Sequence, residues 1–396
     1  MKGLWLLTRR NLTYHSGRTL ILVACLALSV FVPVATQVLV RHFDHQLRAR
    51  AVATPLVAGA GAQKLDLTLE ALYFREADLD PLRWKDFERI RSQGMGLAVP
   101  LHATHHARGR SLLGTTPEYF EQRGLVPATG TLPLMVGDVV LGARMARDLE
   151  LSVGDELFSD PVALYDISKP ASFRLLVCGI LAERGERDDL AAFVDIKTAW
   201  VLDGLYHGHK AAADIATEDP DLIIGREGDD RTGSMAISGA LIEENVMDTA
   251  TVDSFHFHGN QDELPLSSVL VWPGSHKDRT LLKARVNDWP GLQMVTPIDV
   301  IDELMAKVVR VKGVLDRLAV LLAGSTGMLI ALVLALSLRL RRGELMTLNR
   351  IGCARGTVVQ LVLLEILVVV GASLLIATLA TIATVTWTPH LVEMLP

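Results

Sequence analysis

Three long stretches of apolar residues without charge constrain this chain more than any other feature. They run over 19–40, over 318–338, and within 358–387, where the uncharged core begins at Ile366. A helix needs about 20 apolar residues to cross the hydrocarbon core of a bilayer. We therefore predict three transmembrane helices, at 19–40, 318–338 and 358–387. The hydrophobic content of the whole chain, 50%, agrees with a membrane protein that also has a large aqueous domain.

The charges divide the rest of the chain by side of the membrane. Residues 41–313 hold 29 of the 39 Lys and Arg residues and 41 of the 45 acidic residues, a net charge of −12. The short segments 1–18 and 339–357 are basic, and basic flanking loops stay in the cytoplasm. We expect these two segments inside and the tail 388–396 outside. An acidic balance also argues against nucleic-acid binding.

The first apolar stretch has an alternative reading as a cleaved signal peptide. Its 22 residues exceed the apolar core of about 7–15 residues that signal peptides carry, and no small-residue cleavage site follows. We therefore expect a retained span. A mature protein that begins near residue 40 would overturn this topology.

Residues 41–296 mix strand and helix patterns and predict an α+β extracytoplasmic domain, as one body or two small lobes. Alternation at Leu65, Leu67 and Leu69 predicts a strand. Further strands are predicted at 111–115, 138–141, 173–181 and 191–195, and helices at 86–93, 117–122, 143–149 and 197–202. The stretch 207–239 is predicted to be a long loop or an insertion.

Twelve histidines raise the question of a metal site. His256 and His258 are two residues apart and would project from one face of a strand. His207 and His209 repeat that spacing, and a third group holds His102, His105 and His106. Without a third ligand at a predictable position, we interpret these residues as polar edge and loop positions, with His256 and His258 as weak metal candidates.

Catalytic patterns are missing from the sequence. It has no nucleophile elbow, no HExxH pair and no phosphate-binding Gly-Lys-Ser/Thr loop. We therefore expect no ATPase, no enzyme activity and no cofactor in this chain.

The stretch 297–338 predicts one long helix that leaves the aqueous domain and becomes the second span. Thr296 can cap it, Pro297 suits its first turn, and Asp299 favours its positive end. Apolar residues follow in alternating steps of three and four, which is a heptad seam. The seam residues are Ile301, Leu304, Val308, Val311, Leu315, Leu318 and Leu322.

We call 297–317 the stalk, and the heptad seam favours a second copy of the chain as its partner. The alternative is a helix packed on its own domain, followed by a separate span. Gly313 is the one weak point of the pattern and the candidate hinge.

A compact amphipathic element follows the second span. Leu345, Leu348 and Ile351 would share one face of a short helix that Gly352 ends. A helix this short cannot cover its own apolar face. It therefore lies either in the membrane interface or against a cytoplasmic partner protein.

The stretch Arg341–Glu365, which reads RRGELMTLNRIGCARGTVVQLVLLE, resembles the coupling segment of FtsX/MacB-type ABC transporter permeases. The basic N-terminus is similar to theirs, and the stretch from Tyr119 to Asp155 resembles the MacB-type periplasmic domain. Carried over by position, the expected ATPase contacts are Arg341, Arg342, Glu344, Leu345, Leu348, Arg350, Ile351, Gly352 and Cys353.

The resemblance implies a permease subunit of the bacterial inner membrane that performs mechanotransmission. Its expected partners are a cytoplasmic ABC ATPase dimer that binds ATP and Mg²⁺, a second permease copy or sister subunit, and a periplasmic adaptor or lipoprotein. The family usually has four spans, so this chain would be a three-span variant. The competing readings are a membrane-anchored metal-binding protein or enzyme that uses the His-x-His sites, and a sensor that signals inward.

Overall fold

The computed structural model describes residues 2–14, 16–61, 63–160, 173–208, 223–227, 234–237, 255–257, 260–340 and 355–393. The chain divides into two compact units. A helical unit comprises Met1–Leu47 and Glu303–Pro396, and an α/β domain comprises Arg48–Asp302.

The helical unit contains helices α1 (Lys2–Tyr14), α2 (Ser16–Ala53), α10 (Pro297–Leu340) and α12 (Arg355–Glu393). Three of them contain segments long and apolar enough to cross a membrane: Ser16–Ala53, Pro297–Val333 and Val359–Thr386. These segments enclose or overlap all three predicted windows. Helix α2 continues past Val40 because no glycine or proline interrupts the polar stretch that follows.

Small polar side chains link the three long helices of this unit. The hydroxyl groups of Ser29 on α2 and Thr326 on α10 lie 3.2 Å apart. Ser373 on α12 donates a hydrogen bond of 3.2 Å to the carbonyl oxygen of Val23 on α2. Such interhelical hydrogen bonds satisfy groups that hydrocarbon would leave unpaired. Thr326 belongs to a run of small residues at 323–327, and its hydroxyl contacts α2 of the same chain.

The α/β domain is built on one mixed sheet. In the described residues its strands run in the order β16-β1-β15-β3-β4-β9-β6-β8-β5, and β7 adds to β8. Their bounds are β1 Leu56–Ala60, β3 Gly96–Ala107, β4 Arg110–Thr115, β5 Pro127–Gly130, β6 Asp138–Leu141, β7 Glu156–Phe158, β8 Arg174–Leu181, β9 Ala192–Asp195, β15 Ser268–Pro273 and β16 Leu292–Val295. The pairs β4–β9 and β6–β8 are parallel, and the remaining pairs are antiparallel.

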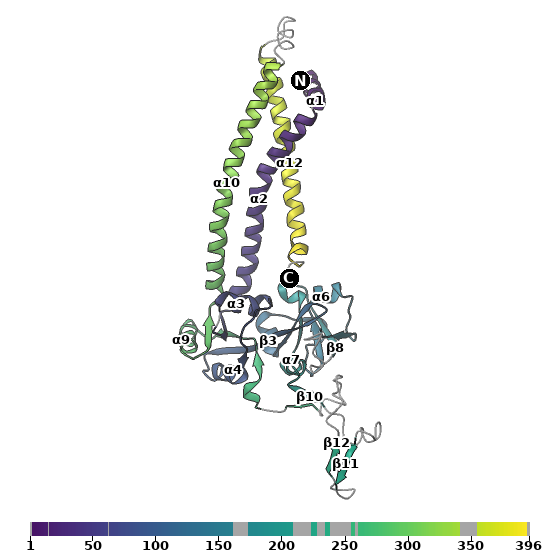
Figure 1. Cartoon of the computed structure of the whole chain (residues 1–396), viewed down its shortest axis with the longest axis vertical. Helices are drawn as coiled ribbons and strands as arrows, with labels where there is room; N and C mark the ends of the chain where they lie inside the picture. Colours follow the sequence, from purple (N-terminus) through teal and green to yellow (C-terminus); the bar gives the residue numbers. More distant parts are fainter. Residues whose placement is uncertain are drawn as a thin grey trace. The chain divides into compact units, whose positions relative to one another are not determined.

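Shorter elements complete the domain (Figure 1). The two-stranded pairs join β2 (Leu82–Arg83) to β14 (Pro265–Leu266), β10 (Tyr206–Gly208) to β13 (Phe255–Phe257), and β11 (Ile223–Glu227) to β12 (Ser234–Ile237). The helices are α3 Lys64–Tyr73, α4 Trp84–Arg91, α5 Pro117–Arg123, α6 Ala143–Asp148, α7 Ile196–Leu202 and α9 His276–Asn287, with 3₁₀ turns η1 Arg187–Leu190 and η4 Gln261–Glu263.

Two apolar cores share the one sheet, so the single-domain reading describes it better than two separate lobes. One core groups Leu56 and Val271 of the sheet with Phe87 of α4 and Val286 of α9. The other groups Leu112, Val139 and Val177 of the sheet with Met145 of α6. The predicted strands at 111–115, 138–141, 173–181 and 191–195 match β4, β6, β8 and β9 within one residue.

One local prediction is wrong. The strand expected at Leu65, Leu67 and Leu69 is helix α3. Leu67 and Ala71, four residues apart, are both buried in it, so the helical period and good helix formers outweigh the alternation. For the stretch 207–239, predicted to be a loop or an insertion, the described residues include the paired strands β11 and β12, which favours the insertion.

Candidate functional site

The predicted ATPase contacts from Arg341 to Cys353 lie outside the described residues, so their role stays a prediction. Among the described residues, α10 ends at Leu340 and α12 begins at Arg355. The last residues of the resembling segment, Arg355–Glu365, lie in α12.

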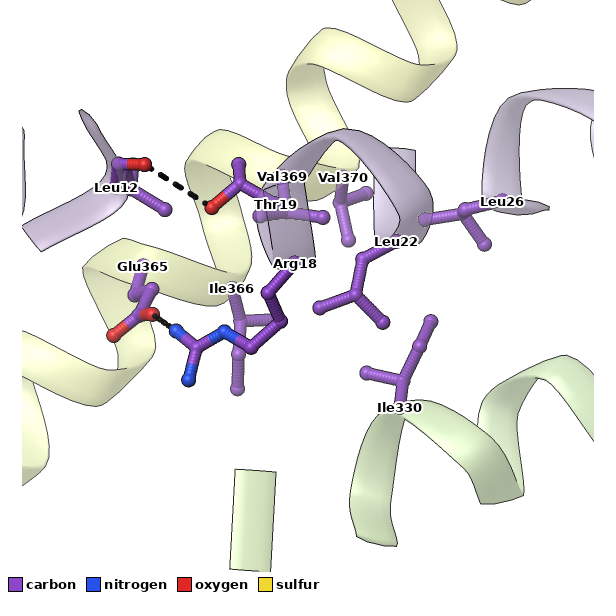
Figure 2. A pocket seen from close by; sticks show the side chains of 10 residues that line it. All are labelled: Leu12, Arg18, Thr19, Leu22, Leu26, Ile330, Glu365, Ile366, Val369 and Val370. Atoms are coloured by element: carbon purple, nitrogen blue, oxygen red, sulfur yellow. Dashed lines mark hydrogen bonds and ion pairs between the residues drawn. The ribbon is translucent and has the colours of Figure 1, made fainter. Parts of the chain in front are cut away.

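An ion pair inside the helical unit neutralises the acid at the edge of the third apolar stretch. Arg18 Nη2 lies 2.6 Å from Glu365 Oε1, and the Glu365 side chain is 8% exposed. Figure 2 shows this pair in a pocket whose other lining side chains are almost all apolar. Ionisable groups at membrane depth normally pair in this way. One ion pair in an apolar lining gives a solute little polar surface to follow.

The stalk seam divides into a covered part and an uncovered part. Ile301 is buried, and Leu304 and Val308 are half-buried. Four further members of the seam are largely exposed within the described chain: Val311 63%, Leu315 49%, Leu318 56% and Leu322 49%. Helix α10 passes Gly313 without a break. Both the hinge at Gly313 and the partner of the seam stay predictions.

The last turn of α2 enters the α/β domain and carries a buried cation. Arg50 Nη2 donates to Asp188 Oδ1 at 3.0 Å, and its Nη1 contacts the other carboxylate oxygen. Tyr119 donates to Asp188 at 2.7 Å, and Arg123 donates to it at 3.2 Å. The guanidinium of Arg50 also lies 4.9 Å from the ring centre of Phe74. The side chains of Arg50 and Asp188 are 5% and 0% exposed.

The charges of this cluster support one another. Burial by itself would raise the pKa of Asp188, but Arg50, Arg123 and the Tyr119 hydroxyl hold it well below its usual range. Burial would lower the pKa of Arg50, but Asp188, Tyr119 and Glu186 raise it. Both groups are therefore ionised in the folded domain, and each depends on the other to remain so.

A second short ion pair lies where both long helices meet the domain. Arg48 on α2 lies 2.5 Å from Asp302 on α10. At the start of α10, Lys283 of α9 donates to the Thr296 hydroxyl at 2.9 Å and lies 3.6 Å from Asp299. The entry of α2 and the exit of α10 are thus each tied to the domain by charged side chains.

The structure describes some of the predicted histidine positions. His256 lies in β13, opposite His207 of β10 in the backbone register, and His258 lies outside the described residues. His102 and His105 are instead buried together against Asp203, a residue that the sequence did not suggest. Among the described residues, these three form the only group of histidine, cysteine or acidic side chains with ligand atoms close enough to share a metal ion.

Comparisons with known proteins give weak likenesses only. No family model matches the chain, and no curated protein matches it. Among solved structures, the periplasmic region of MacB from Actinobacillus actinomycetemcomitans aligns at 11% identity with a TM-score of 0.36, covering 66% of this chain and 97% of that one.

Two further solved structures give similar values. The extracellular domain of the noncanonic ABC-type transporter YknZ from Gram-positive bacteria aligns at 11% identity and a TM-score of 0.31, covering 61% of this chain and 98% of that one. A domain of a permease protein from Porphyromonas gingivalis aligns at 11% identity and 0.26, covering 61% and 86%.

Proposed function

We propose that this chain is the permease subunit of an ABC transporter, which couples ATP hydrolysis in a separate cytoplasmic ATPase to work by its external α/β domain. The observation that carries the proposal is helix α10. It begins at Pro297, two positions after β16 ends, and continues unbroken through the second apolar window to Leu340. The segment that resembles a permease coupling element follows at once.

A continuous helix suits transmission of force along its axis. At 1.5 Å per residue, the 44 residues of α10 extend about 66 Å, roughly twice the hydrocarbon thickness. A displacement of the segment 341–353 would therefore be carried to the α/β domain along α10. Lys283 and Arg48 hold the domain end of that helix through Asp299 and Asp302.

The work would be done on the outer side of the membrane, as export, extraction or activation of an envelope substrate. The substrate would not pass between the spans of this chain. The described spans support this choice, because their pocket offers one ion pair, Arg18–Glu365, among apolar side chains. ATP and Mg²⁺ would bind the partner ATPase. We place the chain in a bacterial inner membrane with its N-terminus in the cytoplasm and its C-terminus outside.

To test whether the segment 341–353 binds the ATPase, we would reverse the charge of one residue there and replace one apolar residue by a charged one. We expect Glu344→Arg and Leu348→Arg each to abolish co-purification of the ATPase with the permease and to lower transport-linked ATPase activity at least about tenfold. The loss of one interfacial anchor typically costs 2 kcal/mol or more. The measurement is affinity purification of the complex in detergent.

The matched control for this experiment is Glu118→Arg, which makes the same charge change at an exposed position of α5. It should leave co-purification and activity unchanged. Normal ATPase binding by both Glu344→Arg and Leu348→Arg would remove the coupling assignment.

The exposed part of the stalk seam predicts a second copy of this chain as its partner. With Cys25, Cys178 and Cys353 replaced by serine, we expect Leu318→Cys to form an intermolecular disulfide under mild oxidation. A disulfide requires Cα atoms within about 7 Å, which a seam position meets in a parallel helix pair. Non-reducing electrophoresis of membranes measures the product.

The control is Val320→Cys. Val320 is 72% exposed, so it is at least as accessible as Leu318, but it projects from the opposite side of the helix. It should remain uncrosslinked. Equal cross-linking at both positions would reflect random collision, and none at Leu318 would exclude a self-paired seam.

A further inference from the structure

An irregularity in strand β3 brings two histidines to one face. His102 and His105 are three residues apart, and in a regular strand they would project to opposite faces. In the pairing with β4, however, His102 lies opposite Gly114 and His105 opposite Leu112. Three steps on β3 thus match two on β4, which is a β-bulge. The extra residue restores both imidazoles to the same side of the sheet.

Helix α7 supplies a carboxylate to the same place. Asp203 is the C-cap of α7, which packs closely on β4. A Cβ atom at Gly114 would come within 2.4 Å of the Ala199 Cβ, so only glycine permits this approach. Asp203 Oδ1 lies 3.0 Å from His105 Nε2, and Oδ2 lies 2.9 Å from His102 Nε2.

Burial and hydrogen bonding single out this trio. His102 is 2% exposed and His105 is 5% exposed. The Nε2 atom of His102 also lies 2.9 Å from the hydroxyl oxygen of Thr104. The same nitrogen lies 2.9 Å from Asp203 Oδ2, so His102 Nε2 faces two oxygen atoms with a single N–H. Two imidazole nitrogens and a carboxylate at one buried point form the donor set that a Zn²⁺ ion takes.

We propose that His102, His105 and Asp203 bind one Zn²⁺ ion through the two Nε2 atoms and the Asp203 carboxylate. The ligand atoms already lie within 4.8 Å of one another. Zn²⁺ takes imidazole and carboxylate ligands in tetrahedral sites, whereas Ca²⁺ and Mg²⁺ require oxygen ligands. Thr104 is exposed and Asp203 partly so, which leaves an approach from solvent and a fourth position for water or the Thr104 hydroxyl.

The proposed ion would fasten strand β3 to the end of α7. Strand β10 begins only three residues after Asp203. It pairs with β13, and residues 209–254 lie between these two strands in the sequence. Zinc would therefore fix the point at which this segment leaves the domain core. This inference concerns the α/β domain alone and holds whether or not the chain is a permease.

The affinity should be moderate. Metal-bound histidines usually donate their second N–H to a neighbouring acceptor, and the loss of such a partner costs about 10–100-fold in affinity. The Nδ1 atom of His102 is buried without a hydrogen-bond partner among the described residues. We therefore expect binding weaker than in fully supported structural zinc sites by about that factor.

The test uses the full chain in detergent, purified with a tag that contains no histidine, stripped with chelator and reloaded with Zn²⁺. We expect about one zinc per chain by elemental analysis, a Zn²⁺-dependent rise in Tm, and a visible Co²⁺ spectrum typical of tetrahedral coordination. His102→Ala and Asp203→Asn should each lower Zn²⁺ affinity at least about tenfold and remove the Co²⁺ spectrum. Circular dichroism without metal verifies that the variants fold.

Two controls make the result specific to this trio. His106 neighbours His105 on β3, but its Nδ1 faces Glu76 at 3.4 Å, so His106→Ala should keep the metal. His256→Ala tests the His-x-His alternative and should also keep it. Loss of zinc in His256→Ala with retention in His102→Ala would overturn the proposal. So would a wild-type chain that holds no stoichiometric zinc after reloading.

Discussion

Replacing Asp188 by asparagine is expected to lower the free energy of unfolding of the α/β domain by about 3–5 kcal/mol. Removing one partner of a buried ion pair leaves an uncompensated charge, and losses of this size follow. Here Arg50, whose side chain is 5% exposed, would lose its two-point contact with Asp188 and keep only Glu186 at 3.7 Å, whereas Arg123 would keep Glu186 at 2.6 Å. Asparagine keeps the volume of the side chain but supplies neither the charge nor a second acceptor oxygen.

Urea denaturation of the full chain in detergent, followed by tryptophan fluorescence, measures the effect. Four of the six tryptophans, Trp84, Trp200, Trp272 and Trp289, lie in the α/β domain. The control is Glu156→Gln, which breaks the ion pair with Arg174. Those two side chains are 47% and 40% exposed, so the loss should stay below about 1 kcal/mol. A similarly small loss for Asp188→Asn would mean that the Arg50 cluster contributes little to stability.

The pH dependence of the same cluster has a definite sign. Because the pKa of Asp188 is held below that of the unfolded chain, its contribution is present at neutral pH. It is lost as the pH falls below the unfolded pKa of about 3.9 toward the folded one. The wild-type chain and Asp188→Asn should therefore converge in stability in acid.

The sequence predicts the parts of this fold that depend on local pattern. The apolar windows recur as α2, α10 and α12, and strands such as 138–141 lie where buried β-branched residues cluster. The error at Leu65, Leu67 and Leu69 arose because three leucines at even spacing fit a strand as well as a helix. Helix α3 is favoured by what it packs on, since Leu67 fills the space above Gly59 of β1.

The candidate sites depend on long-range pairing, and the sequence could not supply them. Arg50 meets Asp188 across 138 positions. His105 meets Asp203 across 98 positions. The two histidines share a face only because of the bulge in β3, which no residue spacing announces. Gly114, opposite His102 on β4, allows α7 to pack closely on the sheet. Its role can be recognised only once the pairing of β3 with β4 is known.

The second large effect is expected at Glu70, whose substitution should stabilise the domain. Glu70 is 6% exposed on α3, and its Oε2 atom has no hydrogen-bond partner among the described residues. Burial raises the pKa of its carboxyl from an ordinary 4.5 to about 7, although a hydrogen bond with Ser267 opposes the rise. The folded chain therefore binds a proton that the unfolded chain releases between these two pH values.

The sign of the linkage follows from that difference. A folded-state pKa above the unfolded value means that stability falls as the pH rises from about 4.5 to about 7, and then levels off. At about 1.4 kcal/mol per pH unit, the wild-type chain gives up about 3 kcal/mol over this range. Glutamine keeps the shape and carries no charge at any pH.

We therefore expect Glu70→Gln to be more stable than the wild-type chain by about 3 kcal/mol at pH 8, and nearly equal to it at pH 4.5, in urea denaturation series at both values. Glu118→Gln, at an exposed site, should show no such divergence. A Glu70→Gln variant that is no more stable at pH 8 would mean that the buried carboxylate is compensated. Divergence of the two stability curves between pH 4.5 and pH 8 would show that ionisation of Glu70, buried on α3, destabilises the wild-type α/β domain as the pH approaches neutrality.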